Sequence, residues 1–461
     1  MPEPKDIWEA LYRRFDPDEP AHKGQWRADR RWSPIPSISA GLKRPFGEKR
    51  YLVMGTVGTG KTTELLRVAE ERSEDHVVVF LDLWRHFEEG VGDPNALQHV
   101  QTWEVLLLIG LAVYRAAEAR FGHVWSKDDL RDLERAAARF TAQPGEAGAS
   151  GTVDLARLAS SLLVFAGGPV GVLAGSAAEA GIKAIGEVAR ASRWDFKIGE
   201  RGRKSLPDQD ERVQEMLGAV NTLIGTIQHQ YRRLLLLVDG LDRIKVAETT
   251  RSLFVESTVL GSLSCATVLT APLVLRRKGL AAQVRRFEPK VLANAPVIDR
   301  HDPHQEGDGI DFLLDVFRRR VADLPAPPGV ARAADCIAEA HLRHLAWCSG
   351  GRARDFVRFV RMVAERAWDH GAAVAPQEIV NDAIDERRNV MEMGLNKRHI
   401  ELLIEVMQDP ERLLPDDEAI EALLEQWCLL PYPNGSEWYF PHPLLTLRRV
   451  PLPPRKAGST A

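Results

Sequence analysis

The stretch GTVGTGKTT at residues 55–63 limits the fold of this chain more than any other feature of the sequence. It follows the apolar run YLVM, which is typical of a buried strand, and it precedes ELLRVAEER, whose apolar spacing predicts a helix. Gly55, Gly60, Lys61 and Thr62 match the pattern G-x-x-x-x-G-K-[ST] in full. The sequence therefore predicts a phosphate-binding loop between a strand and a helix.

Each position of this loop has a chemical task. Glycines let backbone N–H groups surround an anion, and the start of the next helix presents the positive end of its dipole. We expect Lys61 to reach the β- and γ-phosphates of a bound nucleotide, and the Thr62 hydroxyl to ligate Mg²⁺. The predicted nucleotide-binding residues of the loop are Gly55, Gly58, Gly60, Lys61, Thr62 and Thr63.

A second motif supplies the acidic residue that such a metal site needs. Residues 234–243 read LLLLVDGLDR, an aliphatic run that ends in Asp239. An unbroken apolar run fits a strand buried on both faces of a parallel sheet, and ligands bind at the carboxyl ends of such strands. We expect Asp239 to hold Mg²⁺ through water, and Asp242 to orient water or a loop nearby.

Other apolar runs predict the rest of the sheet. Residues 76–82 and 266–270 read as strands, and residues 291–298 are a candidate fifth strand. Because helical stretches separate these runs, we predict a three-layer α/β fold with a parallel sheet, that of a P-loop NTPase. Thr270, at the end of its strand, would either sense the γ-phosphate or merely cap the strand.

Composition sets few further limits. The chain has 461 residues and a net charge of −4, which gives no overall attraction for nucleic acid or acidic lipid. Its four cysteines lie at no metal-ligand spacing, so we expect reduced, buried thiols. The N-terminus lacks the apolar segment of a secretory signal, which predicts a cytoplasmic protein.

With both motifs present, the chain resembles the AAA+/STAND group of P-loop ATPases. The segment DGLDR, residues 239–243, is similar to the STAND and KAP forms of the Walker B motif. Motor AAA+ enzymes carry a water-activating glutamate directly after the metal-binding aspartate, where this chain has Gly240. The resemblance therefore implies slow hydrolysis, suited to a switch, unless Asp242 or another residue substitutes.

The segment SGGRARDFVR, residues 349–358, resembles the start of an AAA+ lid helix. The resemblance implies that Arg354 is the sensor arginine that reaches the γ-phosphate from a small helical domain. The alternative is that Arg352, Arg354, Arg358 and Arg361 form a solvated basic face.

The C-terminal region has the outline of a winged helix. Residues 396–408 and 417–427 predict helices, and two short strands around an Asn-Gly turn follow. His442 comes next and resembles the histidine of the NLR winged helix, which contacts the β-phosphate of ADP. In this chain proline replaces the methionine and the aspartate that flank that histidine in the family.

A long insertion separates the two Walker motifs. Residues 103–121 and 127–140 predict helices, and residues 143–152 predict a flexible connector. Residues 158–178 carry no charge and could span a bilayer, as inserted segments of KAP ATPases do. Pro169, the many small residues and the lack of an aromatic belt favour a buried or partner-binding apolar hairpin over membrane contact.

We predict five regions along the chain. They are an N-terminal arm over residues 1–45, whose aromatic residues pack on the ATPase core or on a neighbouring subunit; an ATPase core over 46–300 with an insertion at about 100–205; a helical lid over 305–393; a winged helix over 394–450; and a disordered tail over 451–461.

Two functional hypotheses follow. The first is a slowly hydrolysing ATP-dependent switch that forms a homo-oligomer in its ATP state and controls a partner protein or effector, as in prokaryotic defence or signalling modules. The alternative is a DNA-binding AAA+ ATPase of the origin-recognition or transposition-helper type. Four acidic residues at 417–425, on the predicted recognition helix, argue against DNA binding. A scaffold that binds nucleotide only structurally is a third option.

Overall fold

The computed structural model describes residues 3–21, 26–141, 164–166, 209–432 and 437–454. The chain forms two compact units. The sheet unit comprises Pro34–Val57 and Glu64–Val291. The terminal unit comprises Met1–Ser33, Gly58–Thr63 and Leu292–Ala461.

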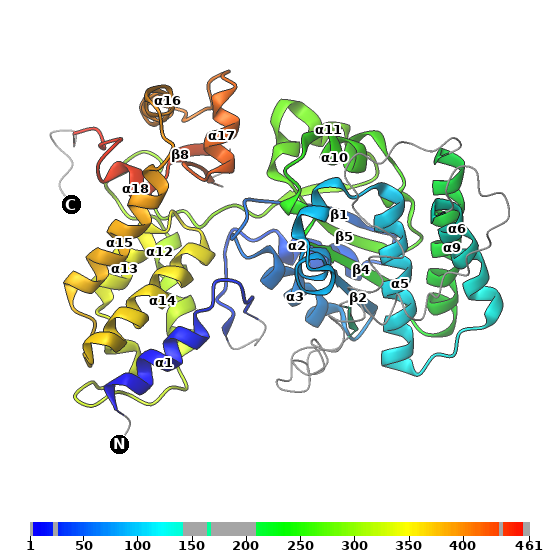
Figure 1. Cartoon of the computed structure of the whole chain (residues 1–461), viewed down its shortest axis with the longest axis horizontal. Coiled ribbons are helices and arrows are strands. Elements are labelled where there is room, and N and C mark those ends of the chain that lie inside the picture. The colour runs from blue at the N-terminus through cyan, green and yellow to red at the C-terminus, as the bar shows by residue number, and fades with distance from the viewer. Residues whose placement is uncertain (1–2, 22–25, 142–163, 167–208, 433–436, 455–461) are drawn as a thin grey trace. The chain divides into compact units, whose positions relative to one another are not determined.

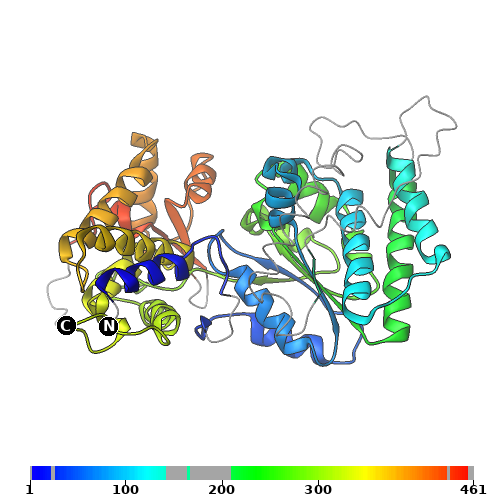
Figure 2. The ribbon, with the colours of Figure 1, turned by 60° about the horizontal axis from the view of Figure 1, so that its bottom comes forward.

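The sheet unit is built on parallel strands in the order β3-β2-β4-β5-β1-β6, of which only the pair β2 and β3 is antiparallel. Counted in chain order, the five parallel strands lie as 5-1-4-3-2, and helices lie on both sides of the sheet (Figures 1 and 2). This is the ASCE-type P-loop NTPase sheet, so the predicted fold class is confirmed. The strands are β1 (Arg50–Met54), β2 (Val77–Asp82), β3 (Val164–Ala166), β4 (Leu234–Asp239), β5 (Ala266–Ala271) and β6 (Glu288–Val291).

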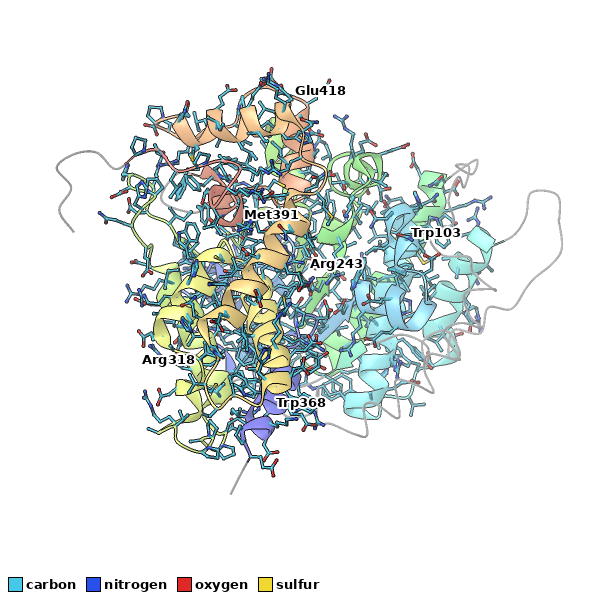
Figure 3. All side chains as sticks on the ribbon, turned by 60° about the vertical axis from the view of Figure 1, so that its left-hand side comes forward. Trp103, Arg243, Arg318, Trp368, Met391 and Glu418 are labelled. Atoms are coloured by element: carbon cyan, nitrogen blue, oxygen red, sulfur yellow. The ribbon has the colours of Figure 1, made fainter. Side chains whose placement is uncertain are left out.

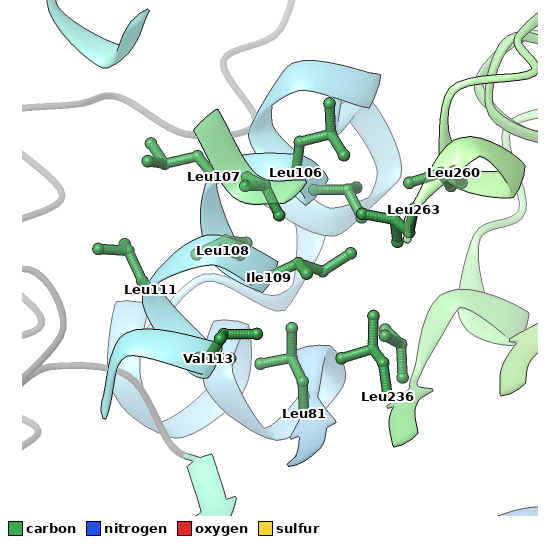
Figure 4. Packing of buried hydrophobic residues seen from close by; sticks show 14 of the residues in the cluster. Leu81, Leu106, Leu107, Leu108, Ile109, Leu111, Val113, Leu236, Leu260 and Leu263 are labelled. Carbon is green, nitrogen blue, oxygen red and sulfur yellow. The ribbon is translucent and has the colours of Figure 1, made fainter. Parts of the chain in front are cut away.

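The core of this unit forms where long helices meet the strands. Helix α5 (Thr102–Phe121) is buried along most of its length and packs against β2 and α9 (Gln209–Gln230). Figure 4 shows Ile109 of α5 close to Leu81 of β2 and Leu236 of β4, all of them fully buried. The remaining helices are α2 (Ile35–Lys43), α3 (Lys61–Arg72), α4 (Leu83–Arg85), α6 (Lys127–Thr141), α10 (Ala247–Arg251) and α11 (Leu280–Gln283).

The fifth parallel strand lies earlier in the chain than predicted. It is Glu288–Val291, whereas the predicted strand covers residues 291–298. Because β6 pairs only with β1 at the edge of the sheet, its residues stay exposed or half-buried and carry no apolar signal. The apolar residues after it are buried in the terminal unit instead, and Ile298 forms a single bridge with Glu306.

Part of the uncharged segment at 158–178 joins the sheet. Val164–Ala166 forms β3, which pairs antiparallel with β2. The rest of that segment and the predicted connector at 143–152 lie outside the described residues, so the hairpin stays a prediction. In the part of the chain that the structure describes, no helix is long and apolar enough to cross a membrane.

The terminal unit is helical. Helix α14 (Ala353–His370) buries the apolar face that the sequence predicted, including Phe356, Phe359 and Val363. The other helices of this part are α1 (Pro4–Arg14), α12 (Gly309–Val321), α13 (Glu339–Cys348) and α15 (Gln377–Glu392).

The first helix of the N-terminal arm packs on these helices, whereas the prediction placed the aromatic residues of the arm on the ATPase core or on a neighbouring subunit. Helix α1 lies against α14, where Trp8 Nε1 donates to the Ala372 carbonyl at 2.6 Å. Asp16 pairs with Arg361 at 2.6 Å. The reason is that Ile7, Trp8 and Leu11 form one buried apolar face of α1, which packs against α14. The basic residue Arg361 of α14 pairs with the acidic residue that follows α1.

The C-terminal module, residues 397–450, has the predicted order of helices and strands. It contains α16 (Lys397–Gln408), α17 (Ala419–Glu425), the antiparallel pair β7 (Leu429–Tyr432) and β8 (Trp438–Pro441), and α18 (Pro443–Thr446). The Asn-Gly turn between the strands and the tail from residue 455 onward lie outside the described residues. All four cysteines are free and buried, as predicted.

Candidate nucleotide-binding site

The phosphate loop starts where β1 ends and leads into α3, as the motif requires. Gly58 and Gly60 have φ angles of +92° and +96°, a left-handed conformation that a side chain disfavours. Lys61 is the first residue of α3 and is 5% exposed. The loop therefore has glycine at the positions where its backbone needs it, and it fits the phosphates of a nucleotide.

Residues of the terminal unit hold the second half of this loop. The backbone N–H of Arg354 donates to the Gly58 carbonyl at 3.1 Å, so the start of α14 lies directly on the loop. Arg30, from the N-terminal arm, donates through Nη2 to the Thr59 carbonyl at 2.7 Å. The Ala21 N–H donates to Thr63 Oγ1 at 3.2 Å, so Thr63 is bonded to the arm.

Polar residues end three neighbouring strands at one edge of the sheet. Asp239 ends β4 and lies in register with Asp82, the last residue of β2. Burial and the Asp239 carboxylate raise the pKa of Asp82 to about 7. Thr270, near the end of β5, is fully buried, and its hydroxyl has no hydrogen-bond partner among the described residues. A bound phosphate oxygen or water at this edge would satisfy that hydroxyl.

Gly240 leaves no room for a side chain. Its φ is +90°, and a Cβ atom there would lie 2.5 Å from the Trp84 backbone nitrogen. The following residues form a short helical turn, Leu241–Arg243, in which Asp242 is half-buried. The Arg243 guanidinium, labelled in Figure 3, lies 4.2 Å from the centre of the Trp84 ring. The fold thus disfavours any side chain, glutamate included, at the position where motor AAA+ enzymes carry that residue.

Of the four arginines that the sequence could place on a solvated face, Arg352 is buried and Arg354, Arg358 and Arg361 are half-buried. Arg352 is 1% exposed and pairs with Asp355 at 2.5 Å. Burial lowers the pKa of Arg352 to about 10, so it remains a cation at neutral pH. Burial alone would raise the pKa of Asp355, but Arg352 and further nearby cations lower it below its usual value. Arg358 also pairs with Asp355, at 3.2 Å.

His442 directly precedes α18 and lies against the turn that precedes α14. Its backbone N–H donates to the Cys428 carbonyl at 2.8 Å, and its Nδ1 accepts from the Leu444 N–H at 3.3 Å. A Cβ atom on Gly350 would lie 3.0 Å from its Nε2. Burial lowers the pKa of His442 to about 3, so the ring is neutral. Its role in binding the β-phosphate stays a prediction.

The structure adds residues that the motifs did not single out. Asp82 ends an apolar strand as Asp239 does, and that shared pattern could have revealed it. No local pattern predicted that Arg30 and Arg352 would be buried beside the loop, because arginine is usually exposed and their contacts with Thr59 and Trp427 lie far away in the sequence. Among the described residues, no group of three or more His, Cys, Asp or Glu side chains is placed so that it could hold a metal ion.

No protein-family model and no curated protein matches this chain. Among solved structures, it is similar to Cdc6p from Pyrobaculum aerophilum, at 13% identity and a TM-score of 0.36, over 95% of this chain and 96% of that one. It is also similar to Drosophila ORC bound to DNA, at 11% identity and a TM-score of 0.36, over 96% and 92% of the two chains. A third structure is Aeropyrum pernix ORC1 in complex with DNA, at 13% identity and a TM-score of 0.34, over 96% and 97%. The fold assignment itself rests on the strand order and on the phosphate loop of this chain.

Proposed function

We propose that this chain is an AAA+-type P-loop ATPase that binds Mg·ATP at the loop Gly55–Thr63 and acts as a slow nucleotide-dependent switch. The observation that carries the proposal is the hydrogen bond from the Arg354 N–H to the Gly58 carbonyl. It joins the start of helix α14 directly to the part of the loop that would hold the phosphates, so occupancy of the loop would act on that helix.

The roles of the chain's residues follow from the two motifs. Backbone N–H groups at Gly58 and Gly60, together with Lys61, would bind the phosphates, while Thr62 and Asp239 would hold Mg²⁺. That cation, when bound, neutralises charge that develops on the phosphates. The buried Thr270 hydroxyl and the Arg354 side chain are candidates for sensing the γ-phosphate.

Slow turnover is the second part of the proposal. Gly240 has no side chain to activate water, and the Trp84 backbone prevents one. Any carboxylate that orients the attacking water must come from another position, with Asp242 and Asp82 as the nearest candidates by strand register and chain order. A long-lived ATP state suits a switch that a partner protein or a homo-oligomer reads.

Light scattering of the full chain with ADP, with ATP and with a non-hydrolysable ATP analogue, beside a steady-state turnover assay, tests the proposal. Assembly with the analogue and slow turnover would support a switch. Rapid turnover with no change in mass would contradict it.

A second candidate is a DNA-linked AAA+ ATPase. The observation that favours it is the C-terminal module, which has the helix, helix, hairpin order of a winged helix, a fold that often docks on DNA. Helix α17 is acidic, however, and Glu418 at its start is exposed (Figure 3). Fluorescence anisotropy with duplex DNA decides: binding that weakens steeply with added salt would favour this candidate, and no binding at low salt would remove it.

A further inference from the structure

Arg352 touches three parts of the terminal unit at once. Its Nη1 donates to Asp355 Oδ2 on α14 at 2.5 Å, and its guanidinium lies 3.9 Å from the centre of the Trp427 ring in the C-terminal module. Its Nη2 lies 3.3 Å from the point where a Cβ atom of Gly58 would stand, in the phosphate loop. One buried cation therefore joins the loop, the lid helix and the C-terminal module.

The turn that carries Arg352 is held rigidly. Gly350 and Gly351 have φ angles of +62° and +77°. A Cβ atom on Gly351 would lie 1.8 Å from the Ala295 carbonyl oxygen, and one on Gly350 would lie 2.3 Å from Leu430 Cδ1. The Tyr432 hydroxyl donates to the Gly350 carbonyl at 3.0 Å, which ties the turn to β7. The turn that carries Arg352 is therefore in direct contact with β7 of the C-terminal module.

Trp427 adds a second sign that this contact is specific. It is a non-glycine residue with φ of +61°, a conformation that costs free energy and that surrounding contacts must maintain. Its ring is half-buried, packs against the apolar core of the terminal unit and also lies against the Arg352 guanidinium. The contact with Arg352 is thus one of the interactions that hold this strained residue in place.

We propose that Arg352 is the positioning residue that couples nucleotide at the phosphate loop to the seating of the C-terminal module through Trp427. The inference rests on the proposed function, since it requires phosphate at residues 58–63. Negative charge placed beside Gly58 attracts the Arg352 guanidinium, which changes its contact with Trp427. If nucleotide changes the stability of the contact at Trp427, then by thermodynamic linkage a substitution that weakens this contact changes nucleotide affinity.

The test replaces Trp427 by leucine in the full chain. Trp368→Leu is the matched control, because Trp368 is 41% exposed on α14 (Figure 3) and lies outside these contacts. The affinities for ADP and for a non-hydrolysable ATP analogue are measured for each protein. Hydrogen exchange is followed in peptides covering residues 419–432.

We expect the ATP analogue to slow exchange in this region of the wild-type protein more than ADP does. In Trp427→Leu that difference should disappear, and the ratio of the two affinities should change about fivefold or more, the range of ordinary coupling. Trp368→Leu should behave as the wild type. Arg352→Lys keeps the charge but loses the planar stacking group, so it should reproduce the Trp427→Leu result even if that variant fails to fold.

Wild-type affinity ratios and a wild-type exchange response in a folded Trp427→Leu or Arg352→Lys protein would overturn the inference. A wild-type chain that binds neither nucleotide would instead refute the proposed function. The two failures are thus distinguishable in the same experiment.

Discussion

Gly240→Ala should destabilise the sheet unit for two separate reasons. The backbone at Gly240 has φ of +90°, and a left-handed conformation costs a non-glycine residue about 1–2 kcal/mol. A Cβ atom would also lie 2.5 Å from the Trp84 nitrogen and 3.0 Å from the Trp84 Cβ. Moving packed backbone to relieve such a contact costs about 1–3 kcal/mol more. The expected loss in free energy of unfolding is therefore about 2–5 kcal/mol.

Gly122→Ala separates these two costs. Gly122 directly follows α5 with φ of +60°, and a Cβ atom there would meet no heavy atom within 4 Å. Its replacement should cost only the conformational part, about 1–2 kcal/mol. The difference between the variants, about 1–3 kcal/mol, then measures the contact with Trp84.

Hydrogen exchange of peptides that cover β2 and β4 is the assay, because it reports the free energy of opening of the sheet itself. If Gly240→Ala and Gly122→Ala raise exchange equally, the Trp84 backbone does not block residue 240, and steric exclusion does not explain the glycine at that position. If Gly240→Ala is the more damaging, Gly240→Glu should not restore rapid hydrolysis, since the same contact excludes any side chain.

Three further predictions concern the loop, the metal and pH. Gly58→Ala should weaken binding of the ATP analogue at least tenfold in a titration. The φ angle of Gly58 is +92°, and a Cβ atom there would lie 3.0 Å from Arg354 Cβ. Unchanged affinity would refute the loop geometry. Asp239→Asn should retain ATP binding but lose hydrolysis in a phosphate-release assay, and wild-type turnover would exclude Asp239 from the metal site. Burial lowers the pKa of His86 from 6.5 to about 4 in the folded protein. Below pH 6.5 the unfolded chain therefore binds a proton that the folded chain does not, and the free energy of unfolding falls by about 3 kcal/mol between pH 6.5 and pH 4. Urea unfolding across that range should show a flatter pH dependence in His86→Phe, and an identical dependence would show that His86 is not the cause.

Elements with strong periodic or apolar patterns could be predicted from the sequence. The strand that ends at Asp239 and the helix after the phosphate loop lie where the motifs placed them, because a parallel strand buried on both faces leaves an unbroken apolar run. The edge strand β6 could not be found in this way, since EPKV has one solvated edge and little apolar character. Strand β3 was missed because its register with β2 depends on pairing across a distant part of the chain.

The candidate site was predictable only as far as motifs reach. The positions of Gly58, Lys61 and Asp239 follow from local spacing. The burial of Arg352 could not be predicted from local spacing. Its guanidinium lies against Trp427, a residue far along the chain that no local pattern connects to it. The bond between Arg30 and the loop likewise depends on how the N-terminal arm returns to residue 59.

Whether residues 55–63 bind nucleotide is decided by isothermal titration of the full chain with Mg²⁺ and a non-hydrolysable ATP analogue, beside the same titration of Lys61→Ala. We expect one site per chain with a dissociation constant on the order of micromolar, and loss of that binding in a Lys61→Ala protein that melts at the wild-type temperature. No binding by the wild type, or equal binding by a folded Lys61→Ala, would contradict the assignment of residues 55–63 as the nucleotide site.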